Sequence, residues 1–197
     1  MKFLNTLKIR LSLLAGLGAL TLIAPAYGDG PRALANHFGP HRNSCYQRVY
    51  DEAHLKAHPQ QRVAMIRFEN FPDVYGPVGE DGKVYFDEKT GEVTFSIIVA
   101  FRDHPHKLYS NDGACYPEGG KLRCGIDCDG GSFTLSDAGK TDIMLHNEGF
   151  RVTVCEGDDE ATAWVDPEPD DKDFKLTRLP DSDCTPPPEL EDNTVSQ

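Results

Sequence analysis

The stretch from residue 93 to residue 101 places large apolar side chains at every second position. These are Val93, Phe95, Ile97, Val99 and Phe101, and they alternate with residues 94, 96, 98, 100 and 102. A period of two is the repeat of a β-strand that buries one face. This pattern constrains the fold of the chain more than any other, and it predicts a β-strand over the whole stretch.

Shorter strands are predicted on both sides of this one, and tight turns separate them. Glycine in these turns accepts the positive φ that short β-turns need. Many short strands joined by tight turns indicate an antiparallel barrel or sandwich. Sequential hairpins favour a meander, so we predict a mainly β fold, a small antiparallel meander barrel, with a sandwich as the alternative. The predicted strands are Arg62–Phe68, Lys83–Phe86, Leu122–Asp127, Ser132–Ser136, Asp142–Leu145, Phe150–Cys155, Ala161–Val165 and Phe174–Leu179, and the turns are 80–82, 88–91, 119–120 and 147–149.

One hairpin can be derived residue by residue. If Gly119-Gly120 is a two-residue turn, Pro117 faces Leu122 and Cys115 faces Cys124 in pairs without backbone hydrogen bonds. Pro117 is tolerated there because its missing N–H is not needed. The α-carbons of such a pair lie about 4.5 Å apart, which is within disulfide range. The register therefore predicts a Cys115–Cys124 disulfide.

The first 28 residues have the layout of a secretory signal peptide. Lys2, Lys8 and Arg10 precede an uncharged apolar run, 11–23, and small residues at 24–26 or 26–28 suit a signal peptidase. The run is shorter than the roughly 20 residues that span a bilayer, so no membrane insertion is expected after cleavage. We expect an exported protein, in the periplasm rather than fully secreted. A single β-rich domain is expected over residues 29–179 and an acidic, Pro-rich tail over 180–197.

All six cysteines lie beyond residue 28. An even number of cysteines in an exported chain indicates disulfides rather than a free catalytic thiol. Besides Cys115–Cys124, we predict that Cys128 pairs with Cys155 and that Cys45 pairs with Cys184.

The charge of the chain restricts its partners. Without residues 1–28, 17 basic residues stand against 32 acidic ones, which gives a formal charge of −15. Such a chain repels nucleic acid and anionic membranes, whose binding depends on Lys and Arg. The expected partners are a small ligand or a cationic protein. The alternative is that the charge only keeps the chain soluble.

A helix is predicted near the N-terminus, after an irregular arm over residues 29–43. Ser44 and Gln47 have the spacing of a capping box, and an apolar stripe follows at helical intervals. Pro59 ends the pattern near Ala57. Cys45–Tyr50 can also be interpreted as a strand.

Two pairs of histidines have spacings that metal sites use. His54 and His58 would share one helix face, but Leu55 stands where the metalloprotease motif needs Glu, so a surface helix is the simpler interpretation. His104 and His106 flank Pro105 and would face the same side of an extended segment. The Pro favours a solvated loop instead, with metal binding as the alternative.

Asp127 and Asp129 suggest a calcium loop. They fit the first and third positions of the EF-hand pattern, but Ala138 stands where the bidentate Glu is required. A strand end followed by a bend explains the segment equally well. No cofactor is therefore predicted, and a bound divalent metal at His104, His106, Asp127 or Asp129 remains the alternative.

The chain contains no G-x-S-x-G, no phosphate-binding loop and no dinucleotide fingerprint, so no catalytic residues are predicted. A set of aromatic residues is expected to form the core or to line a ligand cavity, and they are Phe68, Phe71, Tyr75, Tyr85, Phe86, Phe95, Phe101 and Phe133. We expect a non-enzymatic, exported binding protein for an unidentified ligand. The alternatives are an acidic inhibitor or accessory protein for a cationic exported protein, and a metal-binding protein or hydrolase using His104 and His106.

Overall fold

The computed structural model describes residues 34–39, 41–75, 91–153 and 162–184, with no statement made for the side chain of Tyr75. The predicted signal peptide, the predicted strand Lys83–Phe86, the turns at 80–82 and 88–90, Cys155 and the end of the tail lie outside these residues. In the described part, the elements are nine strands and three short helices. They are β1 (Ser44–Val49), α2 (Glu52–Ala57), β2 (Val63–Asn70), α3 (Pro72–Tyr75), β3 (Val93–Phe101), β4 (His104–Glu118), β5 (Lys121–Ile126), β6 (Gly131–Asp137), β7 (Asp142–Val152), β8 (Ala163–Val165), β9 (Asp173–Arg178) and the 3₁₀ helix η2 (Asp181–Asp183).

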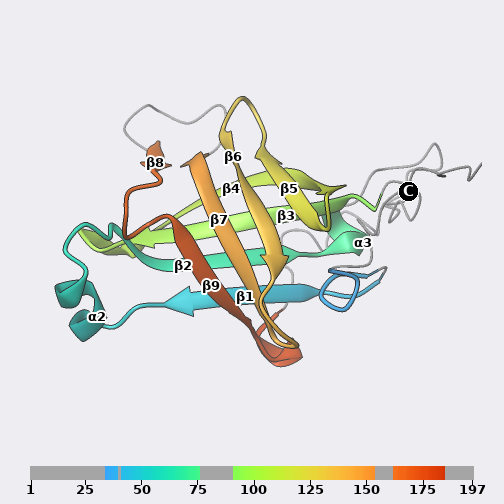
Figure 1. Cartoon of the computed structure of the whole chain (residues 1–197), viewed down its shortest axis with the longest axis horizontal. Helices are drawn as coiled ribbons and strands as arrows, with labels where there is room; N and C mark the ends of the chain where they lie inside the picture. Colours follow the sequence, from blue (N-terminus) through green and yellow to red (C-terminus); the bar gives the residue numbers. More distant parts are fainter. Residues whose placement is uncertain (1–33, 40, 76–90, 154–161, 185–197) are drawn as a thin grey trace, which may run out of the picture.

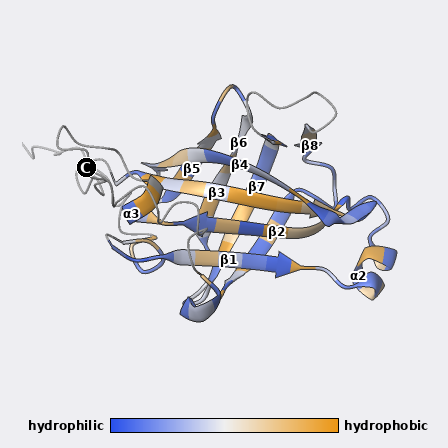
Figure 2. Ribbon diagram, turned by 180° about the vertical axis from the view of Figure 1, so that it is seen from behind, coloured by the Kyte–Doolittle hydropathy of each residue, from blue (hydrophilic) through white to orange (hydrophobic). Residues whose placement is uncertain are grey.

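Eight of the described strands close into an antiparallel barrel (Figure 1). Strands β1 to β7 follow one another as a meander, and β9 then closes the ring between β7 and β1. The short β8 extends the same sheet by pairing with the end of β7. Helices α2 and α3 lie at opposite ends of the barrel in both views (Figures 1 and 2). The predicted meander barrel is confirmed. No described helix has the length and apolarity needed to cross a membrane.

The predicted helix from Ser44 to Ala57 is present only in its second half. Residues 44–49 form β1, which is the strand alternative, because they pair with β2 on one side and β9 on the other. The helix begins at Glu52, where the Asp51 carboxylate caps it by accepting from the His54 backbone N–H at 2.7 Å. It ends at Ala57, before Pro59, as expected. Backbone pairing on both edges outweighs the helical periodicity of residues 46–53.

The β4–β5 hairpin has the predicted register. Glu118 pairs with Lys121 and Cys115 with Cys124, and both turn glycines have positive φ, 56° at Gly119 and 80° at Gly120. The two cysteines are disulfide-bonded, with their α-carbons 3.9 Å apart.

A second disulfide joins Cys45 on β1 to Cys184 after η2, as predicted. The first residues of the predicted tail are therefore ordered, with η2 directly before the bond. Cys128 is itself in a disulfide, and its predicted partner, Cys155, lies outside the described residues. Disulfides of this kind form and persist in oxidising compartments.

The predicted turn at Asn147-Glu148-Gly149 is wrong, because these residues lie within the single strand β7. They form a bulge instead: Phe133 pairs with Asn147 and Gly131 with Phe150, so β7 has one residue more than β6 over this interval. Gly149 adopts a φ of 95°, which a side chain would strain. The bulge also changes the partner of β7, from β9 before it to β8 after it.

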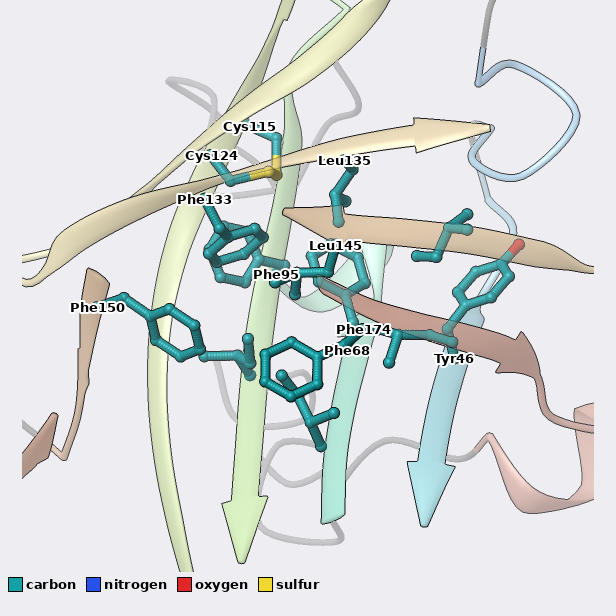
Figure 3. Close-up of a cluster of buried hydrophobic side chains, with 14 of the residues drawn as sticks. Tyr46, Phe68, Phe95, Cys115, Cys124, Phe133, Leu135, Leu145, Phe150 and Phe174 are labelled. Carbon is teal, nitrogen blue, oxygen red and sulfur yellow. A yellow bond between two sulfur atoms is a disulfide. The ribbon is translucent and has the colours of Figure 1, made fainter. Parts of the chain in front are cut away.

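Aromatic side chains fill the barrel interior. Phe68, Phe95, Phe133 and Phe150 are at most 1% exposed, and neighbouring ring centroids lie 5.0–5.4 Å apart (Figure 3). The Cys115–Cys124 disulfide lies beside them. Figure 2 shows the apolar residues concentrated along the strands, most clearly on β3. Each large side chain buried in this way contributes roughly 1.5–3 kcal/mol of transfer free energy.

The described part of the N-terminal arm packs against the barrel. Leu34 and Phe38 are buried, and the Phe38 ring lies 5.7 Å from the Tyr46 ring and 5.5 Å from the Phe68 ring, centroid to centroid. His37 is buried beside them, 1% exposed. The described part of the arm therefore contributes side chains to the core.

Candidate functional site

The candidate metal ligands His104, His106, Asp127 and Asp129 do not come together at one site. His104 and His106 are exposed at the start of β4, which makes that segment a strand and not the predicted loop. The strand begins at His104 because that residue already pairs with Phe101 across a tight β3–β4 turn. Asp127 and Asp129 follow β5, and Asp127 lies beside Asp112 of β4, eight residues along that strand from His104. Among the described residues, no three His, Cys, Asp or Glu side chains are placed to hold a metal ion.

The segment after β5 is a backbone turn. Cys128 and Asp129 both adopt left-handed conformations, with φ of 56° and 55°, and the Gly130 N–H donates to the carbonyls of Ile126 and Asp127. Asp residues accept such φ values more readily than most side chains. The turn thus accounts for the aspartates that resemble the start of a calcium loop.

His54 and His58 share one face of α2, as predicted, and their rings stack at 4.3 Å. Each is engaged elsewhere: His54 Nε2 lies 3.0 Å from Gln61 Oε1, and His58 Nδ1 lies 3.4 Å from Asp170 Oδ1. The Tyr50 ring continues the stack at 4.5 Å from His54. These residues form one side of a surface hollow of about 360 Å³.

A second hollow, of about 470 Å³, lies on the outer face of β4, β5 and β6. Three small residues form its floor: Ala114 pairs with Gly125, and Gly125 pairs with Ser132, so small residues of three adjacent strands lie side by side. Nothing lies within 4 Å of the position that a Gly125 Cβ would occupy. We call this hollow the outer trough.

An aromatic ring and acidic groups surround the floor of the outer trough. Tyr116 pairs with Arg123 on one side, and Asp127 lies on the other side, where its backbone N–H donates to the Asp112 carbonyl. Glu118 also lines the hollow. Tyr116 is 50% exposed, which is unusual for so large a side chain. The trough therefore offers an aromatic surface bordered by carboxylates.

The electrostatics of the trough favour a positive charge. Partial burial, and then the Asp127 carboxylate, raise the pKa of Asp112, although a hydrogen bond with Ser96 opposes them. Partial burial, Glu92 and Asp127 likewise raise the pKa of Tyr116. The basic group at the rim, Arg123, is already paired with Glu148 at 3.3 Å. Among the described residues that line the trough, Arg123 is the basic one, so none is left unpaired to balance the carboxylates.

A cross-strand row of outward side chains runs from the trough to β9. Its members pair in turn across five strands, and they are Tyr116, Arg123, Thr134, His146 and Asp173. Glu148 binds the middle of the row, accepting from Thr134 Oγ1 at 2.8 Å and from Ser132 Oγ at 2.9 Å. The Thr134 bond, then the Ser132 bond and Arg123, lower the pKa of Glu148 against the opposing effect of burial, so this carboxylate stays ionised.

At the far end of the row, three side chains form a hydrogen-bonded chain. Ser136 Oγ lies 2.9 Å from His146 Nε2, and His146 Nδ1 lies 2.6 Å from Asp173 Oδ1. The three residues come from β6, β7 and β9, which are adjacent in the barrel. About a third of the His146 side chain and half of the Asp173 side chain are exposed, 38% and 50%.

Sequence patterns did not identify these residues. Ser136, His146 and Asp173 are far apart in the sequence and belong to no motif, since strand pairing alone brings them together. The predicted strand Asp142–Leu145 also ended before His146, because residues 147–149 were interpreted as a turn. The floor of the trough could not be identified from the sequence either, because it forms only when Ala114 and Gly125 pair across two strands.

Comparisons with known proteins give no relative: no family model, no curated protein and no solved structure matches this chain.

Proposed function

We propose that this protein is an exported, periplasmic binding protein that recognises a cationic segment of another exported protein in the outer trough. The observation that carries the proposal is the row of small residues, Ala114, Gly125 and Ser132, that opens a hollow of about 470 Å³ between an aromatic ring and carboxylates. A Lys or Arg side chain suits such a site. Its aliphatic stem packs on the floor and on the Tyr116 ring, and its charged head meets Asp127.

The packing of the interior supports a site on the outer wall. Barrels of eight strands either fill their interior with side chains or hold one small ligand there. In this barrel, the packed rings of Phe68, Phe95 and Phe133 occupy the interior. A ligand site on the outer surface is consistent with that packing.

The charge of the chain supports a cationic partner. A formal charge of −15 without residues 1–28 steers positively charged proteins toward the surface and speeds their association. Within the trough, a bound cation would lie close to Asp127, and it would weaken the repulsion that Asp127 exerts on the neighbouring Asp112. Affinity should then come from the trough, and the rate of association from the net charge.

The test uses oligo-arginine and oligo-lysine peptides as probes, with oligo-glutamate as the negative control, measured by calorimetry. Gly125→Leu fills the trough at a position with open space, and Asp127→Asn removes one wall charge. The matched controls are Ser110→Leu, an exposed position on the same face of β4, and Asp103→Asn, an exposed acidic residue between β3 and β4.

We expect Gly125→Leu to weaken peptide binding at least tenfold and Asp127→Asn to weaken it about threefold to tenfold, which corresponds to roughly 0.7–1.4 kcal/mol. The two controls should bind like the wild type. Binding should also weaken when salt rises from about 20 mM to about 300 mM, because screening shortens the reach of the charges. Equal binding by Gly125→Leu and Ser110→Leu would show that the acidic surface attracts cations without using the trough.

A further inference from the structure

We propose that Ser136 is an activated nucleophile and that Ser136, His146 and Asp173 form an acyl-transfer site for activated carboxylic esters. This activity is separate from the binding function of the outer trough. It rests on the two hydrogen bonds of the chain, 2.9 Å from Ser136 Oγ to His146 Nε2 and 2.6 Å from His146 Nδ1 to Asp173 Oδ1. A nucleophile, a base and a carboxylate that orients the base are recognised by these roles and distances, whatever fold carries them.

The geometry fixes which nitrogen of the imidazole carries the proton. A carboxylate only accepts hydrogen bonds, so His146 Nδ1 must be the protonated nitrogen that donates to Asp173. In the neutral ring, Nε2 then has a free electron pair and accepts from the Ser136 hydroxyl. This is the tautomer that a general base needs in order to take a proton from serine.

The barrel holds the three side chains on regular strands. Thr134 pairs with His146, and His146 pairs with Asp173, so the base and the carboxylate lie side by side in one cross-strand row. Ser136 is the next outward residue on β6 after Thr134 and reaches His146 from the adjacent row. Groups positioned by strands are held more firmly than groups on loops. Ser136 is half-buried, and the side chains of His146 and Asp173 are partly exposed beside it, so substrate can approach the nucleophile from solvent.

The neighbouring hydroxyls show that the contact is specific to Ser136. Ser132 and Thr134 lie on the same face of β6, and both donate to Glu148 instead. Those two hydroxyls therefore donate to a carboxylate and have no contact with an imidazole base. Among the described residues of β6, Ser136 is the hydroxyl that contacts an imidazole.

The proposed reaction has two balanced steps. The Ser136 oxygen attacks the ester carbonyl carbon while its proton passes to His146 Nε2, and Asp173 stabilises the imidazolium. The bond to the leaving oxygen then breaks, that oxygen takes the proton from Nε2, and an alcohol departs from acyl-Ser136. Water attacks the acyl group with the same base, which releases the carboxylic acid and restores the serine.

The strand environment also sets the substrate class. At Ser136, the backbone of β6 is paired with Met144 of β7. The backbone N–H of Ser136 is therefore used in strand pairing and is not available to stabilise a developing oxyanion. Stabilisation of an oxyanion by backbone donors is a large part of the rate for unactivated substrates. We therefore assign the site to aryl and other activated esters, whose leaving groups need little help.

The test uses the full chain and two probes, a fluorophosphonate that labels activated serines and p-nitrophenyl acetate. We expect the label at Ser136, located by peptide mass spectrometry, and its loss in Ser136→Ala. His146→Gln should slow labelling and ester hydrolysis about 100-fold, because general-base assistance is lost. The control is Ser182→Ala, since Ser182 donates to a carboxylate at 2.9 Å without an imidazole, and it should react like the wild type.

Asp173 is a positioning residue, so its test needs a separate readout. In the wild type, nitrogen NMR should show that the neutral form of the His146 ring carries its proton on Nδ1. In Asp173→Asn, both this tautomer preference and the labelling of Ser136 should be lost. Asp173→Glu should restore part of both. Labelling that is unchanged in a folded His146→Gln variant, or spread evenly over several serines, would overturn the proposal. So would wild-type protein that neither accepts the label nor hydrolyses the ester.

Discussion

The hydroxyl oxygen of Tyr46 and Nδ1 of His37 lie 3.0 Å apart, where the N-terminal arm packs against the barrel. The Tyr46 hydroxyl also lies 3.4 Å from the His37 carbonyl oxygen, so one side chain of β1 holds both the ring and the backbone of the arm. The second ring nitrogen, Nε2, is buried without a hydrogen-bond partner, with Asp137 Oδ2 at 3.9 Å. This imidazole is therefore suited to its neutral form.

The stability of the fold should decrease in mildly acidic solution because of His37. Burial lowers the pKa of His37 below its ordinary value of 6.5; Asp137 opposes this effect, and Arg178 and Arg42 add to it. The unfolded chain therefore binds the proton first as the pH falls, and stability is lost as the pH drops through 6.5 toward the lower pKa of the folded state. Urea unfolding at pH 7.5 and pH 6 should show this loss, and His37→Gln should reduce it. An equal pH dependence in the variant would contradict the assignment.

Gly113 of β4 should tolerate no side chain, whereas Gly125 of the adjacent strand β5 should. A Cβ at Gly113 would lie 2.0 Å from the Gly125 carbonyl oxygen and 2.8 Å from Cζ of Phe95, while a Cβ at Gly125 meets open space. Gly113→Ala should lower the free energy of unfolding by about 3 kcal/mol or more through overpacking, and Gly125→Ala should change it by less than about 0.5 kcal/mol. Denaturant unfolding of the two variants measures the contrast. Similar values for both would show that β4 and β5 can separate to admit a methyl group.

The Cys45–Cys184 bond should stabilise the fold more than the Cys115–Cys124 bond. The first closes a loop with a sequence separation of 139, and the second closes one of 9. Chain entropy in the unfolded state then predicts a loss of about 5 kcal/mol for Cys45→Ala/Cys184→Ala and about 3 kcal/mol for Cys115→Ala/Cys124→Ala. Thermal and urea unfolding of the two double variants would rank them. The opposite order would mean that packing of the hairpin sulfurs inside the barrel outweighs loop length.

Asn147 should be the most sensitive polar residue of β7. Its amide donates to the carbonyls of Val165 at 3.2 Å and Asp171 at 2.9 Å, and its side-chain oxygen accepts from the Gly149 N–H at 2.8 Å. Asn147→Ala leaves these three buried groups without partners and should cost about 2–4 kcal/mol. Hydrogen exchange at the Gly149 amide should accelerate by more than the global loss of stability explains. Exchange that follows global unfolding alone would show that the bulge does not depend on Asn147.

The elements that could be predicted from the sequence are those whose cause is local. The β4–β5 hairpin follows from Gly119-Gly120, because a two-residue turn fixes every pair behind it, including Cys115 with Cys124. The strand 93–101 follows from its alternation. The interpretation of residues 44–49 was ambiguous because their side-chain pattern suits a helix as well as a strand. Pairing with β2, and with β9 more than a hundred residues later, decides between the two.

The candidate sites depend on relations between distant residues. Gly149 looks like a turn residue, and its role in a bulge depends on Gly131 across the ladder, where an added Cβ would lie 2.1 Å from the Gly149 carbonyl oxygen. That bulge sets which side chains of β7 face outward near Glu148, and it could not be deduced from a single strand. For the same reason, the sequence around His146 gives no sign of a site, because Ser136 and Asp173 reach it only when β6, β7 and β9 are aligned.

The length of β4 has a consequence for how these molecules behave at high concentration. Pairing with β5 begins at Gly113, so residues 104–112 of β4 extend beyond the end of β5. An extended edge of this kind can recruit a strand from another copy and start aggregation. Here Pro105 offers no N–H to a visiting strand, and the exposed Lys107 places a charge beside it. We therefore expect the His-Pro-His-Lys start of the strand to disfavour pairing with another copy along this edge.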